Sequence, residues 1–446
     1  MRRVTKDALW LALLCPLTVA AQGVDSPHAG GQDPHLPQPD SKADALLGGP
    51  QSTTQDSQEV KKRTFTAPGV PKVVEKYTTY KGDFFSFRLG FNVVADYDGF
   101  SQDDDSVKQV GAQRDQWDTR SLRFMGSGDI GPKSYKMHYF ASYSFNGFDA
   151  SDNGKESWEF VDLNLTLPAG KLGAVTIGKN KEWFTYEMTG DAIFLPHQER
   201  ILNPFFTSRD VGAVLSNSAF DKRLTYRVGW FNDGWIHGNS PSTDSNHVVS
   251  RVTGLISTNS DGSRYVHVAV AGRYAEATNG VIQLKGRPES NVTDIYVDTG
   301  KIPATSQKEL SLEGLWTHDG FSILSEYVRS WVSATQTAHP SFYGFYVAGG
   351  WMITGDHRPY DRNVAFARRL IPRRRLGAVE VIGKYSRVDL DDKAIHGGVM
   401  DRGTLGVNWY INRFWKLGLD GGVASLDRAG LNGLTWIIQP RLQFLY

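Results

Sequence analysis

Several long stretches of this chain place large apolar residues at every second position, with polar and charged residues between them. The clearest stretch runs from Phe85 to Tyr97, and Arg88, Asn92 and Asp96 occupy the intervening positions. Successive side chains of a β-strand point to opposite faces, so each stretch predicts a strand with one apolar, aromatic-rich face and one polar face. The pattern recurs at 135–145, 163–167, 224–230, 405–411, 415–419 and 434–446.

The polar face of these predicted strands carries too many charges for a dry protein core, because buried charges are costly unless they are paired. A water-filled lumen can hold them, and the apolar face would then meet lipid. A β-sandwich or propeller would also explain the alternation, but not an aromatic final strand that ends on Tyr446. The basic residues expected to line the lumen are Arg88, Lys136, Arg227, Arg273 and Lys384.

The connections between the predicted strands alternate in length. Long polar loops are expected at 98–113, 232–247, 277–306 and 389–402, and short turns at 168–171, 261–263 and 318–320. Long loops on one side and short turns on the other are typical of a transmembrane barrel. About 16 strands fit between Phe84 and Tyr446, and an even number returns the chain to its starting side. The predicted fold is therefore an all-β, transmembrane antiparallel β-barrel.

The first 76 residues predict an export signal followed by a linker. Basic residues at Arg2, Arg3 and Lys6 precede a short apolar stretch and small residues up to Ala21. We predict a cleaved signal peptide over 1–21, with an N-terminal membrane anchor as the alternative. Residues 22–76 are rich in Gly, Pro, Ser, Gln and Asp and predict a disordered periplasmic linker, and the barrel is expected over 77–446.

Composition and motifs favour a channel over an enzyme or a nucleic-acid-binding protein. The formal net charge is +1, so global charge favours no nucleic-acid partner. No nucleophile elbow, phosphate-binding Gly-Lys-Ser/Thr loop or His-Glu-x-x-His motif is found, and the single cysteine lies within the signal. The spacing of Asp356, His357 and Asp361 is loose for metal ligands. We expect no catalytic residues, metal or cofactor.

Two stretches resemble the phosphate-selective porin O and P family. One is Thr176-Ile-Gly-Lys-Asn-Lys-Glu182, followed by Asn203-Pro-Phe205 and Ser208-Arg-Asp-Val-Gly212. The other runs from Trp351-Met-Ile-Thr-Gly-Asp-His-Arg-Pro-Tyr360 through 372–378 to 385–390. The resemblance covers about Tyr80 to Tyr446. It implies a 16-stranded outer-membrane barrel, commonly trimeric, whose third long loop folds inward to narrow the pore.

The inward loop is expected at about 182–210, and its charges leave the preferred solute open. Basic residues at the narrowing would raise the local anion concentration, which favours phosphate or polyphosphate. This segment contains no Lys and several acids, so a general porin with a mixed constriction is an equal alternative, and a plugged, non-conducting barrel is a third. The candidate constriction residues are Lys179, Lys181, Arg200, Arg209, Glu187 and Asp191.

A second basic segment spans 355–375, where seven arginines oppose two aspartates. Strand parity places it on the periplasmic side, where it is long for a turn. It predicts either a basic vestibule that passes anions or a solvated loop that only assists folding. The expected partners are outer-membrane lipid, lipopolysaccharide, small anionic solutes and two further copies in a homotrimer. The vestibule candidates are Arg358, Arg362, Arg373, Arg374 and Arg375.

Overall fold

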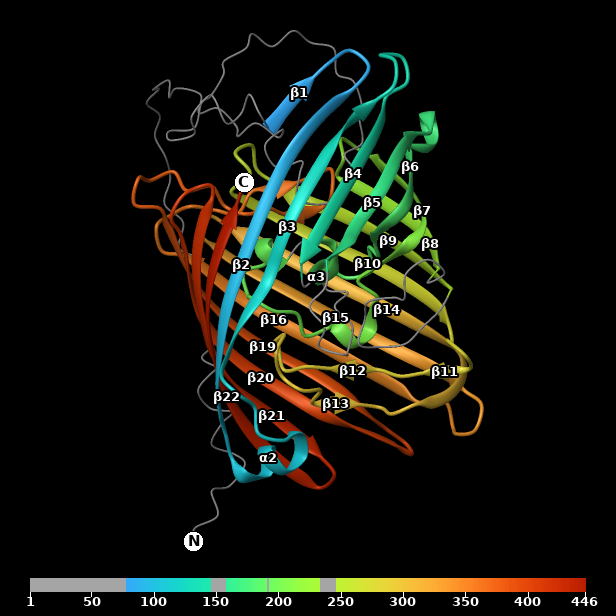
Figure 1. Ribbon diagram of the computed structural model, residues 1–446, viewed down its shortest axis with the longest axis vertical. Coiled ribbons are helices and arrows are strands. Elements are labelled where there is room, and N and C mark those ends of the chain that lie inside the picture. Colours follow the sequence, from blue (N-terminus) through green and yellow to red (C-terminus); the bar gives the residue numbers. More distant parts are fainter. Residues whose placement is uncertain (1–77, 146–157, 191, 233–245) are drawn as a thin grey trace, which may run out of the picture. The chain divides into compact units, whose positions relative to one another are not determined.

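The computed structural model describes residues 78–145, 158–190, 192–232 and 246–446. Sixteen long strands follow one another around a single antiparallel sheet, each paired with its neighbours in chain order (Figure 1). They are β2 (Ser86–Gln102), β3 (Gln116–Ile130), β4 (Met137–Phe145), β5 (Trp158–Pro168), β6 (Ala174–Lys181), β7 (Arg209–Ala219), β8 (Leu224–Asn232), β9 (His247–Thr258), β10 (Arg264–Glu276), β14 (Ile302–His318), β15 (Phe321–Ala334), β16 (Ser341–Met352), β19 (Ala378–Asp392), β20 (Ile395–Tyr410), β21 (Trp415–Arg428) and β22 (Leu431–Leu445).

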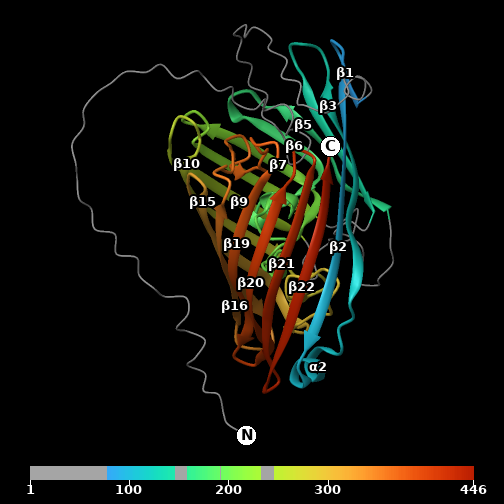
Figure 2. The same ribbon diagram turned by 90° about the vertical axis from the view of Figure 1, so that its left-hand side faces the viewer.

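The sheet closes on itself because the last strand pairs with the first long one. β22 lies antiparallel to β2, with a register that runs from Asn92 opposite Leu445 to Gln102 opposite Thr435. Figure 2 shows β22 and β2 side by side. Closure removes the open edges that would leave backbone N–H and C=O groups without partners in lipid. The predicted 16-stranded antiparallel barrel is confirmed.

The remaining elements are short and lie in the connections or before the barrel. β1 (Thr79–Lys81) pairs with the start of β2. The others are α2 (Asp104–Val110), α3 (Tyr186–Thr189), the 3₁₀ turns η3 (Gly170–Leu172), η4 (Ala192–Phe194) and η5 (Asn203–Phe205), and the two-residue strands β11 (Val281–Ile282), β12 (Lys285–Gly286), β13 (Val297–Asp298), β17 (Tyr360–Asp361) and β18 (Phe366–Ala367). No helix among the described residues is both long and apolar enough to cross a membrane.

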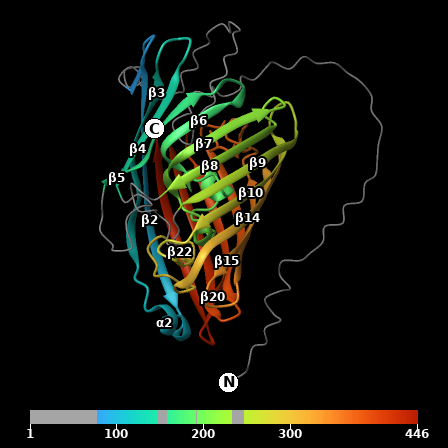
Figure 3. The same ribbon diagram turned by 90° about the vertical axis from the view of Figure 1, so that its right-hand side faces the viewer.

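The two faces of the wall differ as the alternation predicts. In β2, Asn92 and Asp96 are buried on the lumen side, while Leu89 is exposed on the outer side. The same division holds in β8 to β10, the part of the wall seen in Figure 3. Aromatic and aliphatic side chains thus form the outer surface, which suits contact with lipid.

The connections at one end of the barrel are short with one exception, whereas those at the other end are of mixed length, with 335–340, 393–394 and 429–430 short as well. Short turns occupy 131–136, 169–173, 220–223, 259–263, 319–320 and 411–414, at the end of the barrel that also holds the C-terminus. Residues 353–377 are the long exception at this end. The predicted outer loops near 98–113 and 277–306 correspond to 103–115 and 277–301, and most of 232–247 lies outside the described residues.

One predicted loop is wrong. Residues 389–402 form the tip of a hairpin in which Asp392 of β19 faces Ile395 of β20. The density of charges suggested a solvated loop, yet these charges bridge the two strands on the outer face. The Arg387 guanidinium donates to the Asp401 carboxylate at 2.9 Å, from one strand to the next. Cross-strand pairs of opposite charge stabilise a sheet, so these charges are compatible with paired strands.

Candidate functional site: the narrowed lumen

The connection between β6 and β7, residues 182–208, folds into the barrel instead of projecting from it. Among its described residues all but Ala192 and Asn203 are buried. Its short helix α3 lies within the barrel in Figure 1. Thr185 caps this helix by accepting from the Met188 N–H at 3.1 Å, and the N–H groups of Tyr186 and Glu187 donate to the Glu326 carboxylate of β15. The wall thus holds the helix by its N-terminal end, where a carboxylate is favourable.

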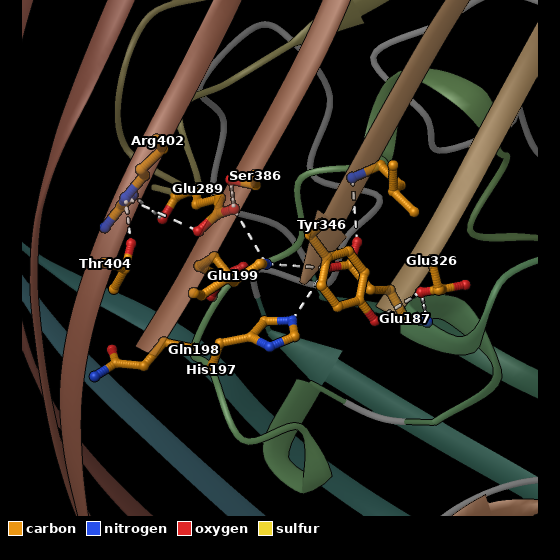
Figure 4. Close-up of polar contacts among 12 residues, drawn as sticks. Glu187, His197, Gln198, Glu199, Glu289, Glu326, Tyr346, Ser386, Arg402 and Thr404 are labelled. Atoms are coloured by element: carbon orange, nitrogen blue, oxygen red, sulfur yellow. Dashed lines mark hydrogen bonds and ion pairs between the residues drawn. The ribbon is translucent and has the colours of Figure 1, made fainter. Parts of the chain in front are cut away.

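Glu187 is the centre of the contacts that fix this loop to the wall (Figure 4). Its carboxylate accepts from His197 at 3.0 Å, from the Leu202 N–H at 3.1 Å and from the Lys384 ammonium of β19 at 3.2 Å. Burial alone would raise the pKa of Glu187, but Lys384 and His197 outweigh it and lower the pKa to about 2. Glu187 and Lys384, predicted separately as constriction and lumen residues, therefore form one structural ion pair.

A second connection, residues 277–301, also folds inward, which the sequence analysis did not predict. The Lys384 ammonium lies 3.1 Å from the Glu289 carboxylate, which also accepts from Ser386 at 2.6 Å (Figure 4). The Tyr296 hydroxyl lies 2.9 Å from that of Thr435 on β22. A signal for this was present, because the segment contains apolar residues that a solvated loop would not need: Val281, Ile282, Leu284, Tyr296 and Val297, all buried or nearly so.

The long connection at the C-terminal end of the barrel, residues 353–377, enters the lumen from the opposite end and packs on loop 182–208. The Phe366 ring stacks on Tyr186 with 4.3 Å between centroids, and the Ala367 N–H donates to the Tyr186 hydroxyl at 3.0 Å. Arg358 reaches further, donating to the Phe194 carbonyl at 3.1 Å and to the Glu380 carboxylate of β19. Two loops and this connection therefore fill much of the lumen.

The predicted vestibule residues separate into three environments. Arg358 is buried and paired inside the barrel, whereas Arg362 forms a surface pair with Asp221 at 2.6 Å. Arg373, Arg374 and Arg375 are exposed at the barrel end. The segment is therefore not one continuous basic vestibule.

The predicted lumen residues also lie in different places. Arg273 donates to Glu309 at 2.9 Å, to Thr207 at 3.2 Å and to Glu182, so it holds both ends of loop 182–208. The Arg227 guanidinium lies 3.5 Å above the Trp183 ring in the same loop. Arg88 and Lys136 are partly exposed near the C-terminal end of the barrel. Most of these cations anchor the loop instead of lining an opening.

An arginine-lined cavity of about 20 Å³ lies between loop 182–208 and the wall, where residues of β2, β3, β7 and β22 line it. That volume is room for about one water. Each of its charged lining residues, among the described part of the chain, is an arginine; the others are Asn92, Val94, Ser121, Ala192 and Ile193. The five arginines are Arg120, Arg123, Arg200, Arg209 and Arg441. We call this cavity and its five arginines the arginine aperture.

Carboxylates hold several of these guanidinium groups in place. Arg120 and Arg441 both contact Glu199 of the loop, at 2.6 and 2.5 Å, and Arg209 contacts Asp162 of β5 at 3.0 Å. Burial would raise the pKa of Glu199, but the two arginines outweigh it and lower the pKa to about 2. Glu199 is therefore a carboxylate that tethers the loop to both β3 and β22.

The predicted constriction residues are partly brought together here. Arg200 and Arg209 line the arginine aperture, Lys179 and Lys181 are buried in β6, and Asp191 lies outside the described residues. Sequence reasoning missed Arg120 and Arg123, because no alternating stretch was recognised over 116–130, and the pairing of β2 with β3 also shifts register opposite Arg120. Both Arg120 and Ser121 are buried in consequence, which breaks the period of two.

Comparison with known proteins decides the family. The model of the family described as phosphate-selective porin O and P matches residues 87–428. The chain belongs to this family. No curated protein matches it.

Three solved structures show the extent of that likeness. The anion-selective porin from Comamonas acidovorans is 13% identical with a TM-score of 0.52, covering 81% of this chain and 100% of its own. OmpT of Vibrio cholerae is 10% identical with a TM-score of 0.51, and the alignment covers 82% of this chain and 100% of that one. OmpF of Salmonella typhi, in complex with daunomycin, is 10% identical with a TM-score of 0.52, covering 82% and 100%. At these identities the likeness concerns the porin fold alone.

Proposed function

We propose that this outer-membrane porin is a water-filled channel for passive diffusion of small anions, phosphate or polyphosphate among them. The arginine aperture carries the proposal. Guanidinium groups bind phosphate oxygens through paired N–H donors and stay charged at any physiological pH. An anion passing loop 182–208 would meet five of them from the loop and three wall strands.

The acids of the inward loop offset part of this positive charge, but they lie against cations and not in the aperture. The several carboxylates of the loop leave a mixed constriction open from the sequence. Glu182, Glu187 and Glu199 contact Arg273, Lys384 and the pair Arg120 and Arg441, respectively. These carboxylates orient cations of the wall, and none of them is among the residues that line the aperture.

Single-channel recording in a planar bilayer tests the proposal. The reversal potential in a potassium chloride gradient reports the charge preference, and a phosphate titration reports competition with chloride. We expect an anion-selective reversal potential and a chloride current that phosphate blocks. A cation-selective reversal potential would refute the proposal, and a weakly selective current that ignores phosphate would favour a general porin.

Matched variants connect the preference to the aperture. Arg123→Gln removes one guanidinium from the aperture, and Arg329→Gln removes one from the outer face of β15, where it contacts Trp331 and Ser341. One charge about 5 Å from a permeating ion in a water-like medium is worth about 0.8 kcal/mol, about a fourfold change in its local concentration. We expect Arg123→Gln to lower the anion-to-cation permeability ratio by about that factor and Arg329→Gln to leave it unchanged.

A second candidate is a barrel that does not conduct. It is favoured by the inward packing of residues 182–208, 277–301 and 353–377, which places Tyr186, Phe194 and Phe366 in the lumen. The same recordings distinguish the two candidates. Folded protein that inserts into the bilayer without current steps would support the non-conducting barrel over the channel.

We further propose that residues 1–21 direct export and are cleaved, that residues 22–76 form a periplasmic linker, and that three copies assemble in the outer membrane in contact with lipopolysaccharide. Support comes from the composition of these segments and from the family. Native mass spectrometry of the purified protein would show a trimer whose subunits begin at Gln22. A monomer, or a subunit that retains Met1, would refute the corresponding part.

A further inference from the structure

The last part of connection 353–377 leaves the lumen and lies against the outer face of the barrel. The indole N–H of Trp409, which belongs to the lipid-facing side of β20, donates to the Leu376 carbonyl at 3.0 Å. The Leu376 side chain is 87% exposed, the highest value among the large hydrophobic residues of the described chain. An aliphatic side chain held beside an outward tryptophan is positioned to contact the membrane.

This position coincides with an aromatic girdle. Phe321, Trp351, Trp409 and Trp415 lie at the ends of β15, β16, β20 and β21 nearest the C-terminus, and all are exposed on the outer face. The rings of Phe321 and Trp351 stack with 5.6 Å between centroids. Outward aromatic residues mark the boundary between hydrocarbon and headgroups in transmembrane barrels. Short turns place this boundary on the periplasmic side.

Basic residues lie beside Leu376 at the same boundary. Arg374 and Arg375 directly precede it, and Arg413 lies in the neighbouring turn 411–414. The two turns touch, because a Cβ on Gly377 would lie 3.1 Å from the Cα of Ile411. No carboxylate of the described chain forms an ion pair with Arg374, Arg375 or Arg413, in contrast to Arg358 and Arg368 inside the barrel. Arg373 points elsewhere, 3.5 Å from His357.

We propose that Arg374, Arg375 and Arg413 bind the phosphate of an anionic phospholipid in the periplasmic leaflet, while Leu376 inserts beside its acyl chains. Each part of such a lipid meets a complementary group: guanidinium groups for the phosphate, an aliphatic side chain and Trp409 for the glycerol and upper acyl region. The site lies outside the lumen, so it does not depend on which solute the channel passes. We call it the periplasmic lipid site.

Native mass spectrometry of the full mature protein in a non-ionic detergent tests this site. Dioleoylphosphatidylglycerol and dioleoylphosphatidylcholine are titrated separately, and adducts are counted at each concentration. The test variant is Arg374→Ser/Arg375→Ser. The matched control is Arg114→Ser/Lys301→Ser, which removes two exposed charges from the opposite end of the barrel. Circular dichroism and heat-modifiable gel mobility verify that each variant folds.

We expect the native protein and the control to prefer phosphatidylglycerol over phosphatidylcholine. The test variant, which lacks two arginines, should bind phosphatidylglycerol about thirtyfold more weakly, since each interfacial arginine contributes about 1 kcal/mol. Leu376→Ser should weaken the binding of both phosphatidylglycerol and phosphatidylcholine. Unchanged phosphatidylglycerol binding in the test variant would overturn the proposal. Displacement of phosphatidylglycerol by millimolar inorganic phosphate would also overturn it, because it would identify a site for free phosphate.

Discussion

Arg358 is the side chain that joins connection 353–377, the inward loop 182–208 and the barrel wall. Its Nε and Nη2 donate to the two Glu380 oxygens at 3.0 and 2.5 Å, and its Nη1 donates to the Phe194 carbonyl at 3.1 Å. Arg358→Met keeps much of the side-chain volume but removes the charge and every one of these bonds. We expect this variant to release connection 353–377 from loop 182–208 and to widen the lumen.

The expected loss of stability in Arg358→Met follows from these contacts. Removing one partner of a buried ion pair costs about 3–5 kcal/mol, because the other charge stays buried. Glu380 still accepts from Tyr410 at 2.9 Å and from Asn408 at 3.1 Å, so the lower end applies. The lost bond to the Phe194 carbonyl adds about 1 kcal/mol. The free energy of unfolding should therefore fall by about 4 kcal/mol. Arg362→Met breaks only the surface pair with Asp221 and should cost less than about 1 kcal/mol.

Two measurements check this reasoning. Urea titration in detergent, followed by tryptophan fluorescence, gives the free energy of unfolding, and planar-bilayer recording gives the single-channel conductance. We expect lower stability and higher conductance for Arg358→Met but not for Arg362→Met. Arg358→Met/Glu380→Met should recover most of the stability, since it removes both members of the buried pair, and should still conduct more than the native channel. A stable Arg358→Met variant with native conductance would refute the role assigned to Arg358.

Three further predictions concern the loop and the N-terminus. The folded-state pKa of Glu199 is about 2, below its ordinary value of 4.5. The stabilisation that the ionised Glu199 provides is therefore complete above pH 4.5 and is lost as the pH falls toward 2. The free energy of unfolding measured against pH should show this loss, and the Glu199→Gln variant should not. A Cβ at Gly190 would overlap the Phe366 ring, so Gly190→Ala should lower the free energy of unfolding, measured by urea titration, by about 1–3 kcal/mol. Phe366→Leu in the same chain should restore part of that stability. If the two substitutions instead lower the stability by the sum of their separate effects, the contact is contradicted. N-terminal sequencing of protein from outer membranes should begin at Gln22, and a sequence starting at Met1 would contradict cleavage after Ala21.

The candidate site was only partly predictable, for identifiable reasons. Arg200 and Arg209 were found because the family resemblance placed an inward loop at 182–210, and both line the arginine aperture. Arg120 was missed because a register shift between β2 and β3 breaks the alternation opposite it, and Arg123 because the sequence over 116–130 was not recognised as an alternating stretch. Lys384 was predicted as a lumen residue and is buried, but its ion pairs with Glu187 and Glu289 depend on two loops whose positions no local pattern specifies.

The closed barrel follows from the sequence itself, because each strand carries its own alternation of lipid-facing and lumen-facing residues and the alternation is a local property of the backbone. The even number of strands likewise predicted that the first and last residues of the barrel lie on the same side of the membrane. Only the tertiary structure decided how the lumen is narrowed. The aperture is set by contacts between residues far apart in the chain, such as Glu199 with Arg441, 242 positions away, and Glu199 with Arg120, 79 positions away. Such contacts depend on where the closed wall places each side chain, and that position is established only when the first and last strands meet.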